Sequence, residues 1–367
     1  MGLYKFKKRI IQEFVRPDTF FLITFSINLI HSILGFFKRN KKNNGSPILI
    51  WDSRRESITY DFTNFILNAV NEFHKKEISY FDLVIYQPKN HIVPTFEFEN
   101  YSLYVNSDQN SKRIKELIYE LAESYSCIRE IKLIQDIKEI KEIIKRSKLV
   151  YPYNYHPKYY QPETTYYKKL HTSLKNDDNY IIPKIVPNLN HSKKFDQFLS
   201  LLKNNDFITL TLRDYGFSPL RNTTNKDVIE ATKLAKKLKF NLAIVPDNKK
   251  NLCNYPISKD SLICFSARKN IKDRINLYAN SKLNIFQTGG PSYIPLFIRG
   301  AKTIMLDVGK AGFDNDEKHW KNDHNLYPGD QPYKRLECYM MWYRFYQNYS
   351  FEDLLKIYKI LNSQTYY

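Results

Sequence analysis

A chain of 367 residues is long enough for two domains, and its 43% hydrophobic and 15% aromatic content excludes a disordered chain. Basic residues exceed acidic ones by 57 − 38 = 19, which favours an anionic partner: a phosphorylated metabolite, a nucleic acid or an anionic membrane. The four cysteines are scattered, without the paired spacing of a zinc or redox site.

Residues 1–46 form a basic arm whose charges sum to 9 − 2 = +7. Within it, residues 19–37 carry no formal charge, and their polar and apolar members recur on opposite faces at helical spacing. Three interpretations stay open: an interfacial anchor, a helix packed on the protein, and a spanning anchor or signal sequence. We favour the first, in which flanking lysines face anionic lipid and the protein is cytoplasmic, peripheral to the inner face of the plasma membrane.

From residue 47 onward, short apolar strands alternate with amphipathic helices. This alternation predicts parallel βαβ units and a first Rossmann-like domain over residues 47–180, to which we assign acceptor binding. The expected strands are 47–52, 81–88, 128–134 and 148–154, and the expected helices are 60–74, 109–124 and 136–147.

A connector rich in proline and tyrosine, residues 155–192, separates this domain from a second one over residues 181–347 that repeats the alternation. Residues 348–367 are expected to form a C-terminal helix that packs back on the body. The expected strands are 207–212, 240–247, 261–266, 282–288 and 301–306, and the expected helices are 163–175, 195–203, 225–238, 270–280, 291–299 and 350–362.

Two glycines interrupt the stretch NIFQTGGPSYIPL, which begins at Asn284. Gly289 and Gly290 follow a predicted parallel strand and precede a predicted helix, and ligands bind at that edge of open α/β sheets. Glycine allows a phosphate to approach the backbone, and a helix start offers N–H groups, so we expect an anion cradle that includes Ser292. The alternative is a tight turn that only requires a positive φ.

Arginines follow another strand of the same half. Arg213 comes directly after the strand FITLTL, and Arg221 lies in the same loop before a possible helix cap at Thr223 or Thr224. Because arginine binds phosphate oxygens bidentately, Arg213 and Arg221 are candidate donor-phosphate ligands beside the glycine turn. Arg268, Lys269 and Arg274 are interpreted instead as solvated residues of a helix face.

The second half of the chain resembles the C-terminal half of GT-B glycosyltransferases, especially the heptosyltransferase-like bacterial enzymes. The resemblance rests on LTLRD…RN, NLAIVPD and DRINLYANSKLNIFQTGGPSYIPLFIRGAKTIMLD, and it covers about residues 193–345. It implies two Rossmann-like domains that face each other across a cleft. It also implies a glycine-rich turn that receives the nucleotide diphosphate, with Arg213 in the place of the family's basic residue. The histidine that is common in that turn is absent here.

The resemblance further implies transfer of a sugar from a nucleotide-diphosphate donor to a cell-surface glycan or lipid-linked acceptor. Asp52 ends the first strand, where similar enzymes carry the base that deprotonates the acceptor hydroxyl. Arg54 and Arg55 follow and are assigned to acceptor binding, or to pairing with Asp52. Asp247 ends a strand and is assigned to the donor's ribose or sugar. No metal or other cofactor is expected, because arginines can stabilise the leaving diphosphate.

The polar loop 311–332 is interpreted as a lid, and a metal site at its Asp314-Asn315-Asp316 is the alternative. Two other functions remain open. One is a sugar-nucleotide epimerase of the same fold. The other is a non-enzymatic protein that binds anionic lipid or nucleic acid, which would place its cations on one exposed face. We expect no nucleic-acid partner, because the cations are spread along the chain.

Overall fold

The computed structural model describes residues 45–54, 56, 58–88, 111–153, 155–157, 179–187, 190–203, 205–214, 219–247, 252–287, 289–307, 338–342 and 349–363. Most of the predicted arm, the predicted helix 163–175, Arg55 and the polar loop 311–332 lie outside the described residues. Within these ranges, no helix has both the length and the apolar character needed to cross a bilayer.

The first sheet has four parallel strands in the order β3-β2-β1-β4. Alternate residues of β1 and β2 belong to two different hydrophobic clusters, one on each face of the sheet. Both faces are therefore buried, as is usual for parallel sheets. The elements are β1 (Pro47–Asp52), α3 (Phe62–His74), β2 (Phe81–Tyr86), η1 (Ile114–Tyr119), α6 (Glu120–Glu123), β3 (Ile128–Ile134), α7 (Ile137–Arg146) and β4 (Leu149–Tyr151).

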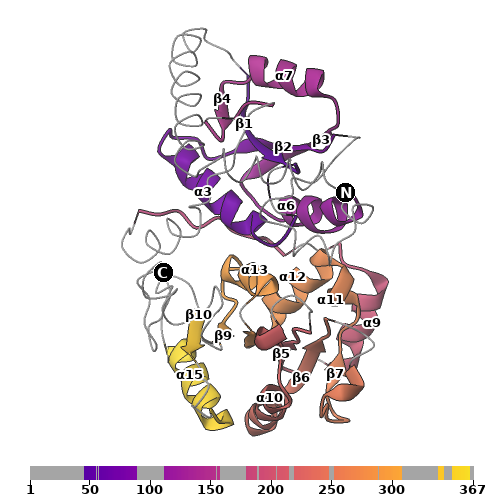
Figure 1. Ribbon diagram of the computed structural model, residues 1–367. Coiled ribbons are helices and arrows are strands. Elements are labelled where there is room, and N and C mark those ends of the chain that lie inside the picture. The colour runs from indigo at the N-terminus through magenta and orange to yellow at the C-terminus, as the bar shows by residue number, and fades with distance from the viewer. Residues whose placement is uncertain are drawn as a thin grey trace, which may run out of the picture.

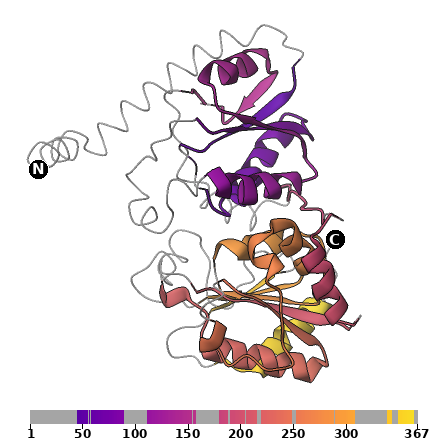
Figure 2. The same ribbon diagram turned by 90° about the vertical axis from the view of Figure 1, so that its right-hand side faces the viewer.

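Helices cover both faces of this first sheet (Figure 2). On one face α3 buries Phe62, Phe65 and Phe73 against the sheet, and Trp51 meets Phe62 edge to face. On the other face α7 buries Ile140. Asp136 caps α7 by accepting a hydrogen bond from the backbone N–H of Lys138 at 2.8 Å.

The second sheet has six parallel strands in the order β10-β9-β8-β5-β6-β7. Its strands are β5 (Phe207–Thr211), β6 (Asn241–Val245), β7 (Leu262–Ile263), β8 (Asn284–Gln287), β9 (Thr303–Asp307) and β10 (Cys338–Trp342). Its helices are α9 (Lys193–Leu201), η2 (Pro219–Arg221), α10 (Asn225–Leu238), η3 (Leu252–Asn254), α11 (Ser266–Lys269), α12 (Ile271–Asn280), η4 (Gly290–Ser292), α13 (Tyr293–Leu296) and α15 (Phe351–Ser363).

Each sheet reverses its direction of growth at one point. In the second sheet the chain starts at β5, adds β6 and β7 on one side, and then adds β8, β9 and β10 on the other. In the first sheet the reversal lies between β1 and β4. Such switch points are where open α/β sheets bind ligands, at the carboxyl ends of the strands.

The predicted architecture of two Rossmann-like parallel-sheet domains is confirmed, with two differences in detail. The strand β10, which pairs in parallel with β9, was not predicted. The predicted helix 291–299 is shorter, and only η4 and α13 form there. The C-terminal helix α15 packs on α10 in the second domain, where Leu354 and Leu361 join its core. The exact domain boundaries stay a prediction.

The two units are stacked, and α6 of the first lies over α12 of the second (Figure 1). The segment that joins them contributes Ile185, whose N–H donates to the carbonyl of Phe297 at 2.8 Å. Glu123 pairs with Lys272 at 2.8 Å, and Glu120 accepts a hydrogen bond from the N–H of Ile271, the first residue of α12, at 3.3 Å. Both domains therefore contribute polar contacts to their boundary.

Candidate active site

The switch point of the second sheet brings Arg213 and Gly289 together. Arg213 follows β5 and Gly289 follows β8, two strands that pair in parallel. The Cδ of Arg213 lies 3.6 Å from the position that a Cβ on Gly289 would take, so the arginine side chain lies alongside the glycine. The structure thus joins the two groups that the sequence assigned to a phosphate site, while their role as phosphate ligands stays a prediction.

The loop after β5 holds Arg213 in place. The backbone N–H of Arg213 donates to Oγ1 of Thr223 at 2.8 Å, and the N–H of Thr223 donates to the carbonyl of Arg213 at 2.8 Å. The guanidinium donates through Nη1 to Oδ1 of Asn222. The next residue, Thr224, caps α10 in a reciprocal pair with Asp227. The two threonines therefore have different roles: Thr223 holds the backbone of Arg213, and Thr224 caps α10.

Neither glycine of the turn is required by a positive φ. Gly289 has a φ of 173°, which is extended backbone, and among the described glycines only Gly300 has a positive φ, of 83°. Gly290 is constrained by a close contact instead. A Cβ placed on it would lie 2.5 Å from Cδ2 of Tyr60, a residue of the first domain. The positive-φ interpretation is wrong for this pair, and close approach across the domain boundary explains the second glycine.

Ser292, a predicted phosphate ligand, forms its hydrogen bonds within the turn, and its role toward a phosphate stays a prediction. It is fully buried, and its hydroxyl donates to the carbonyl of Gly289 at 2.6 Å while its N–H donates to the same carbonyl at 3.1 Å. Its hydrogen-bonding groups thus stabilise the turn. The helix that follows is also only a short 3₁₀ turn and one α-helical turn, so the helix dipole contributes little, and an anion here depends mainly on Arg213.

Asp247 and Arg221 flank this switch point. Asp247 is exposed after β6, and its Oδ2 accepts a hydrogen bond from the N–H of Asp214 at 3.0 Å. Its carbonyl accepts from Nε of Arg268 at 2.7 Å. Arg221 ends η2 immediately before Asn222, the residue that holds Arg213. The carboxylate of Asp247 therefore lies one strand away from Arg213, which suits the predicted contact with a ribose or sugar hydroxyl.

Asp52 lies at the switch point of the first sheet. Its carboxylate is fully buried and accepts hydrogen bonds from Nε and Nη2 of Arg54 at 2.9 and 2.6 Å. It also accepts from the hydroxyl of Tyr155, just beyond β4, at 3.0 Å. Burial and the neighbouring carboxylate raise the pKa of Tyr155 far above its usual value, so this hydroxyl remains a donor. Asp52 and Arg54 pair, which is one of the two predicted alternatives.

Arg54 is oriented by two further groups. Its Nη2 donates to the carbonyl of Pro157 at 2.6 Å, and its guanidinium lies 4.7 Å from the centroid of the Tyr86 ring. The hydroxyl of Ser53, beside it, is buried and has no hydrogen-bond partner among the residues described here. This edge of the first sheet therefore combines a fixed cation with an available hydroxyl.

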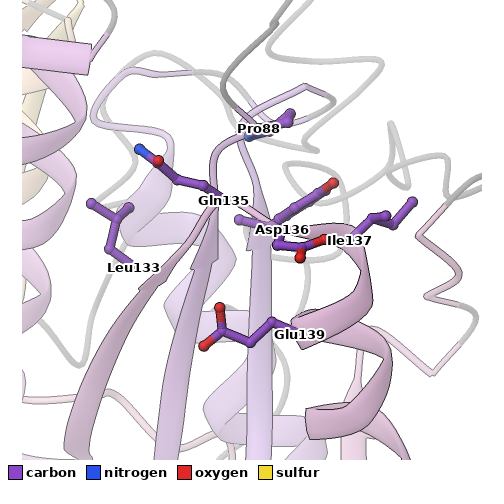
Figure 3. Close-up of a pocket in the computed structure, with 7 residues that line it drawn as sticks. Pro88, Leu133, Gln135, Asp136, Ile137 and Glu139 are labelled. Atoms are coloured by element: carbon purple, nitrogen blue, oxygen red, sulfur yellow. The ribbon is translucent and has the colours of Figure 1, made fainter.

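A surface cavity of about 740 Å³ opens at the same edge, where β2 and β3 end and α7 begins (Figure 3). Tyr86 lines it, and the guanidinium of Arg54 lies 4.7 Å from the centroid of that ring. The carboxylates of Asp136 and Glu139 and the side chains of Leu133 and Ile137 also line it. Such a mixture of acceptor oxygens, apolar groups and an aromatic ring suits a hydroxyl-rich ligand such as a sugar.

Sequence reasoning missed Tyr60 and misread Arg274. Arg274, interpreted as solvated, is only 5% exposed, and its guanidinium donates to the hydroxyl of Tyr60 at 2.6 Å. The signal was present in the helical spacing, since Arg274 shares a face of α12 with Ile271 and Tyr278, both buried. No sequence pattern indicated that Tyr60 of the other domain would reach it.

No cluster of three or more histidine, cysteine, aspartate or glutamate side chains suited to a metal occurs in the part of the chain that the structure describes. The Asp314-Asn315-Asp316 segment lies outside that part.

A scan against family models gives no match, and a search among curated proteins gives none either. Among solved structures, the chain is similar to a family 9 glycosyltransferase from Veillonella parvula, with a TM-score of 0.49 and 8% identity over 89% of this chain and 100% of that one. It is also similar to the iron-containing dodecameric glycosyltransferase TibC of E. coli (TM-score 0.42, 9% identity, 88% and 77% covered). The E. coli heptosyltransferase WaaC with ADP gives a TM-score of 0.38 at 8% identity, with 86% and 98% covered. These similarities are distant, so the chemistry must be inferred from the site itself.

Proposed function

We propose that this protein is a glycosyltransferase that moves a sugar from a nucleotide-diphosphate donor to a glycan or lipid-linked acceptor. The observation that supports the proposal most is the position of Arg213, held beside Gly289 at the switch point of the second sheet. A guanidinium beside a bare backbone at that edge suits the two phosphates of a nucleoside diphosphate.

In the proposed reaction the second domain binds the donor. Arg213 donates to the diphosphate oxygens, with Arg221 in the same loop, and Asp247 accepts from a hydroxyl of the ribose or sugar. When the bond between the anomeric carbon and the phosphate oxygen breaks, its electron pair stays on the diphosphate. The guanidinium stabilises that developing charge, which is the largest electrostatic contribution this site offers. No cofactor takes part in the proposed reaction.

The first domain binds the acceptor in the cavity beside Tyr86. The acceptor oxygen attacks the anomeric carbon, and its proton passes to the carboxylate of Asp52. Arg54 and Tyr155 occupy both oxygens of that carboxylate, so acceptor binding must exchange one of these bonds for the acceptor hydroxyl. Arg54 remains close enough to contact an acceptor with a negative group.

The basic arm, residues 1–46, suits attachment to the inner face of the plasma membrane, where a lipid-linked acceptor would be presented. Sedimentation with vesicles that contain anionic lipid tests this part. The full chain should sediment with the vesicles, and a chain without the arm should not. Equal sedimentation of both would contradict the assignment.

Thermal unfolding with added nucleoside diphosphates and nucleotide sugars tests the donor site. A ligand at 100 times its dissociation constant stabilises the folded protein by about 2.7 kcal/mol, which shifts the melting temperature by several degrees. The corresponding nucleosides, which lack phosphate, should have no such effect. Arg213→Gln should abolish most of the shift, and Arg299→Gln, at an exposed position of the same domain, should keep it.

A chain that no diphosphate stabilises would overturn the proposed function. If a nucleotide sugar stabilises the chain, incubation with it distinguishes a glycosyltransferase from a sugar-nucleotide epimerase. Release of the nucleoside diphosphate in the presence of acceptor indicates transfer. Isomerisation of the sugar without an acceptor would indicate the epimerase instead.

A further inference from the structure

Arg274 is a buried cation with neutral partners. Its guanidinium donates through Nε to the carbonyl of Ala267 at 2.7 Å, through Nη2 to the carbonyl of Arg268 at 3.1 Å, and through Nη1 to the hydroxyl of Tyr60 at 2.6 Å. Among the described residues, no carboxylate lies within ion-pair distance of it. Buried charges in proteins are normally paired, since an uncompensated charge in the interior is costly. The carboxylate of Asp247 acts on the guanidinium through space but forms no ion pair with it, so an anion bound directly to Arg274 would be its first such partner among the described residues.

The third partner differs from the other two. The carbonyls of Ala267 and Arg268 belong to α11, next to Arg274 in the same domain, and they fix the guanidinium plane. Tyr60 belongs to the other domain and is only partly buried. Its carbonyl accepts from the N–H of Thr63 at 2.9 Å, which ties its backbone, so the ring can leave Arg274 by side-chain rotation alone.

The same ring lies on the glycine turn. A Cβ on Gly290 would lie 2.5 Å from Cδ2 of Tyr60, and the preceding glycine lies against Arg213. The turn is therefore in contact with one guanidinium and with the ring that hydrogen-bonds the other. Arg213 reaches it directly, and Arg274 is separated from it by the ring of Tyr60.

We propose that Arg274 is a second binding site for the anionic oxygens of the donor diphosphate and that Tyr60 occupies it when no ligand is bound. This rests on the proposed function, because it takes the turn as the diphosphate site. A phosphate oxygen is a stronger acceptor for a guanidinium than a neutral tyrosine hydroxyl is. The two carbonyls keep the guanidinium oriented for the exchange, so little ordering is needed. Gly290 is then required because any side chain there would hinder the tyrosine.

A permanent domain contact is the competing explanation, and it predicts the opposite effect of one substitution. If Tyr60 competes with the anion, removing its hydroxyl strengthens anion binding. If it only joins the domains, removing the hydroxyl leaves anion binding unchanged or weakens it. A hydrogen bond to a charged group is worth about 1.5 kcal/mol or more, so the expected strengthening is about tenfold.

Calorimetric titration of the full chain with inorganic pyrophosphate at fixed ionic strength distinguishes competition by Tyr60 from a permanent domain contact. We expect Tyr60→Phe to lower the dissociation constant about tenfold, as worked above. Tyr80→Phe, at a 58% exposed tyrosine of the same domain, is the matched control and should change nothing. Arg274→Gln should weaken binding at least about tenfold and make Tyr60→Phe ineffective in its background.

The outcomes separate this inference from the proposed function. Unchanged or weaker binding by Tyr60→Phe, with binding still lost in Arg213→Gln, overturns the role of Tyr60 and Arg274 but leaves the donor site. No binding of pyrophosphate by the wild-type chain overturns both. If Arg274→Gln fails to fold, Tyr60→Phe still decides, because it keeps the buried cation and both of its carbonyl partners.

Discussion

Replacing Gly290 by alanine should destabilise the protein, whereas the same replacement at Gly289 should not. A Cβ at position 290 would lie 2.5 Å from Cδ2 of Tyr60 and 3.1 Å from its Cβ and Cγ. The Cβ of Tyr60 keeps its place when the ring rotates, so rotation alone does not relieve the overlap, and the domains or the turn must shift. Overpacking of this kind costs about 1–3 kcal/mol.

Gly289 gives the matched control. A Cβ there would lie 3.6 Å from Cδ of Arg213, an ordinary van der Waals contact, and the φ of 173° suits alanine. Because alanine also reduces the conformational freedom of the unfolded chain, the change should be neutral or stabilising by about 0.4–1 kcal/mol. Its effect should appear in nucleotide binding, where the methyl group reduces access to the backbone.

Urea unfolding, compared through midpoints at unchanged slope, measures both effects. A double-mutant cycle with Tyr60→Ala isolates the contact, since Gly290→Ala should cost little once the ring is gone, and the coupling should approach the single-mutant cost. Equal stability of the two alanine variants would refute the reasoning. So would a cost at Gly290 that persists in the Tyr60→Ala background.

Two further predictions concern charged groups outside the turn. Arg54→Met should destabilise the fold by about 3 kcal/mol in chemical denaturation, because it leaves the buried Asp52 carboxylate without its cation, and adding Asp52→Asn should restore part of the loss. An unaffected single variant would show that the pair is dispensable. Burial raises the pKa of Glu120, so the folded protein binds this proton more readily than the unfolded chain. The stability that the raised pKa provides is full below the ordinary glutamate pKa near 4.5 and is lost as the pH rises through the folded value. Glu120→Gln, which keeps an acceptor for the N–H of Ile271, should flatten the unfolding free energy over that window, and an unchanged pH profile would contradict the assignment.

The order of strands and helices could be predicted from the sequence because each element carries its own signal. Apolar runs such as PILIWD and FITLTL read as buried parallel strands, and the helices between them show helical periodicity. The approach of Arg213 to Gly289 followed from topology alone, because parallel strands place their carboxyl ends at one edge. The local pattern also predicted a cap for α10 at Thr223 or Thr224, and the structure shows it at Thr224.

Contacts between the domains could not be predicted in this way. Tyr60 and Arg274 are 214 positions apart in the chain, and neither carries a local sign of the other. The short strand β10 follows a long polar segment, so nothing near it indicated a sixth strand. The pairing of Arg54 with Asp52 was one of two alternatives. The sequence places both residues at the sheet edge, but it does not show whether Arg54 pairs with Asp52 or stays available for an acceptor.

One short loop connects the two halves of the proposed site. It begins at Asp52, the last residue of β1, and reaches Tyr60 just before α3. At its start it presents the carboxylate that would take the acceptor proton, and near its end it places a ring on the donor turn and a hydroxyl on Arg274. A ligand that displaces the ring of Tyr60, as proposed, would move a side chain of the same loop that holds Asp52 and Arg54. Under that proposal one loop carries both the ring that the donor displaces and the carboxylate that the acceptor meets, so the two binding events would share it.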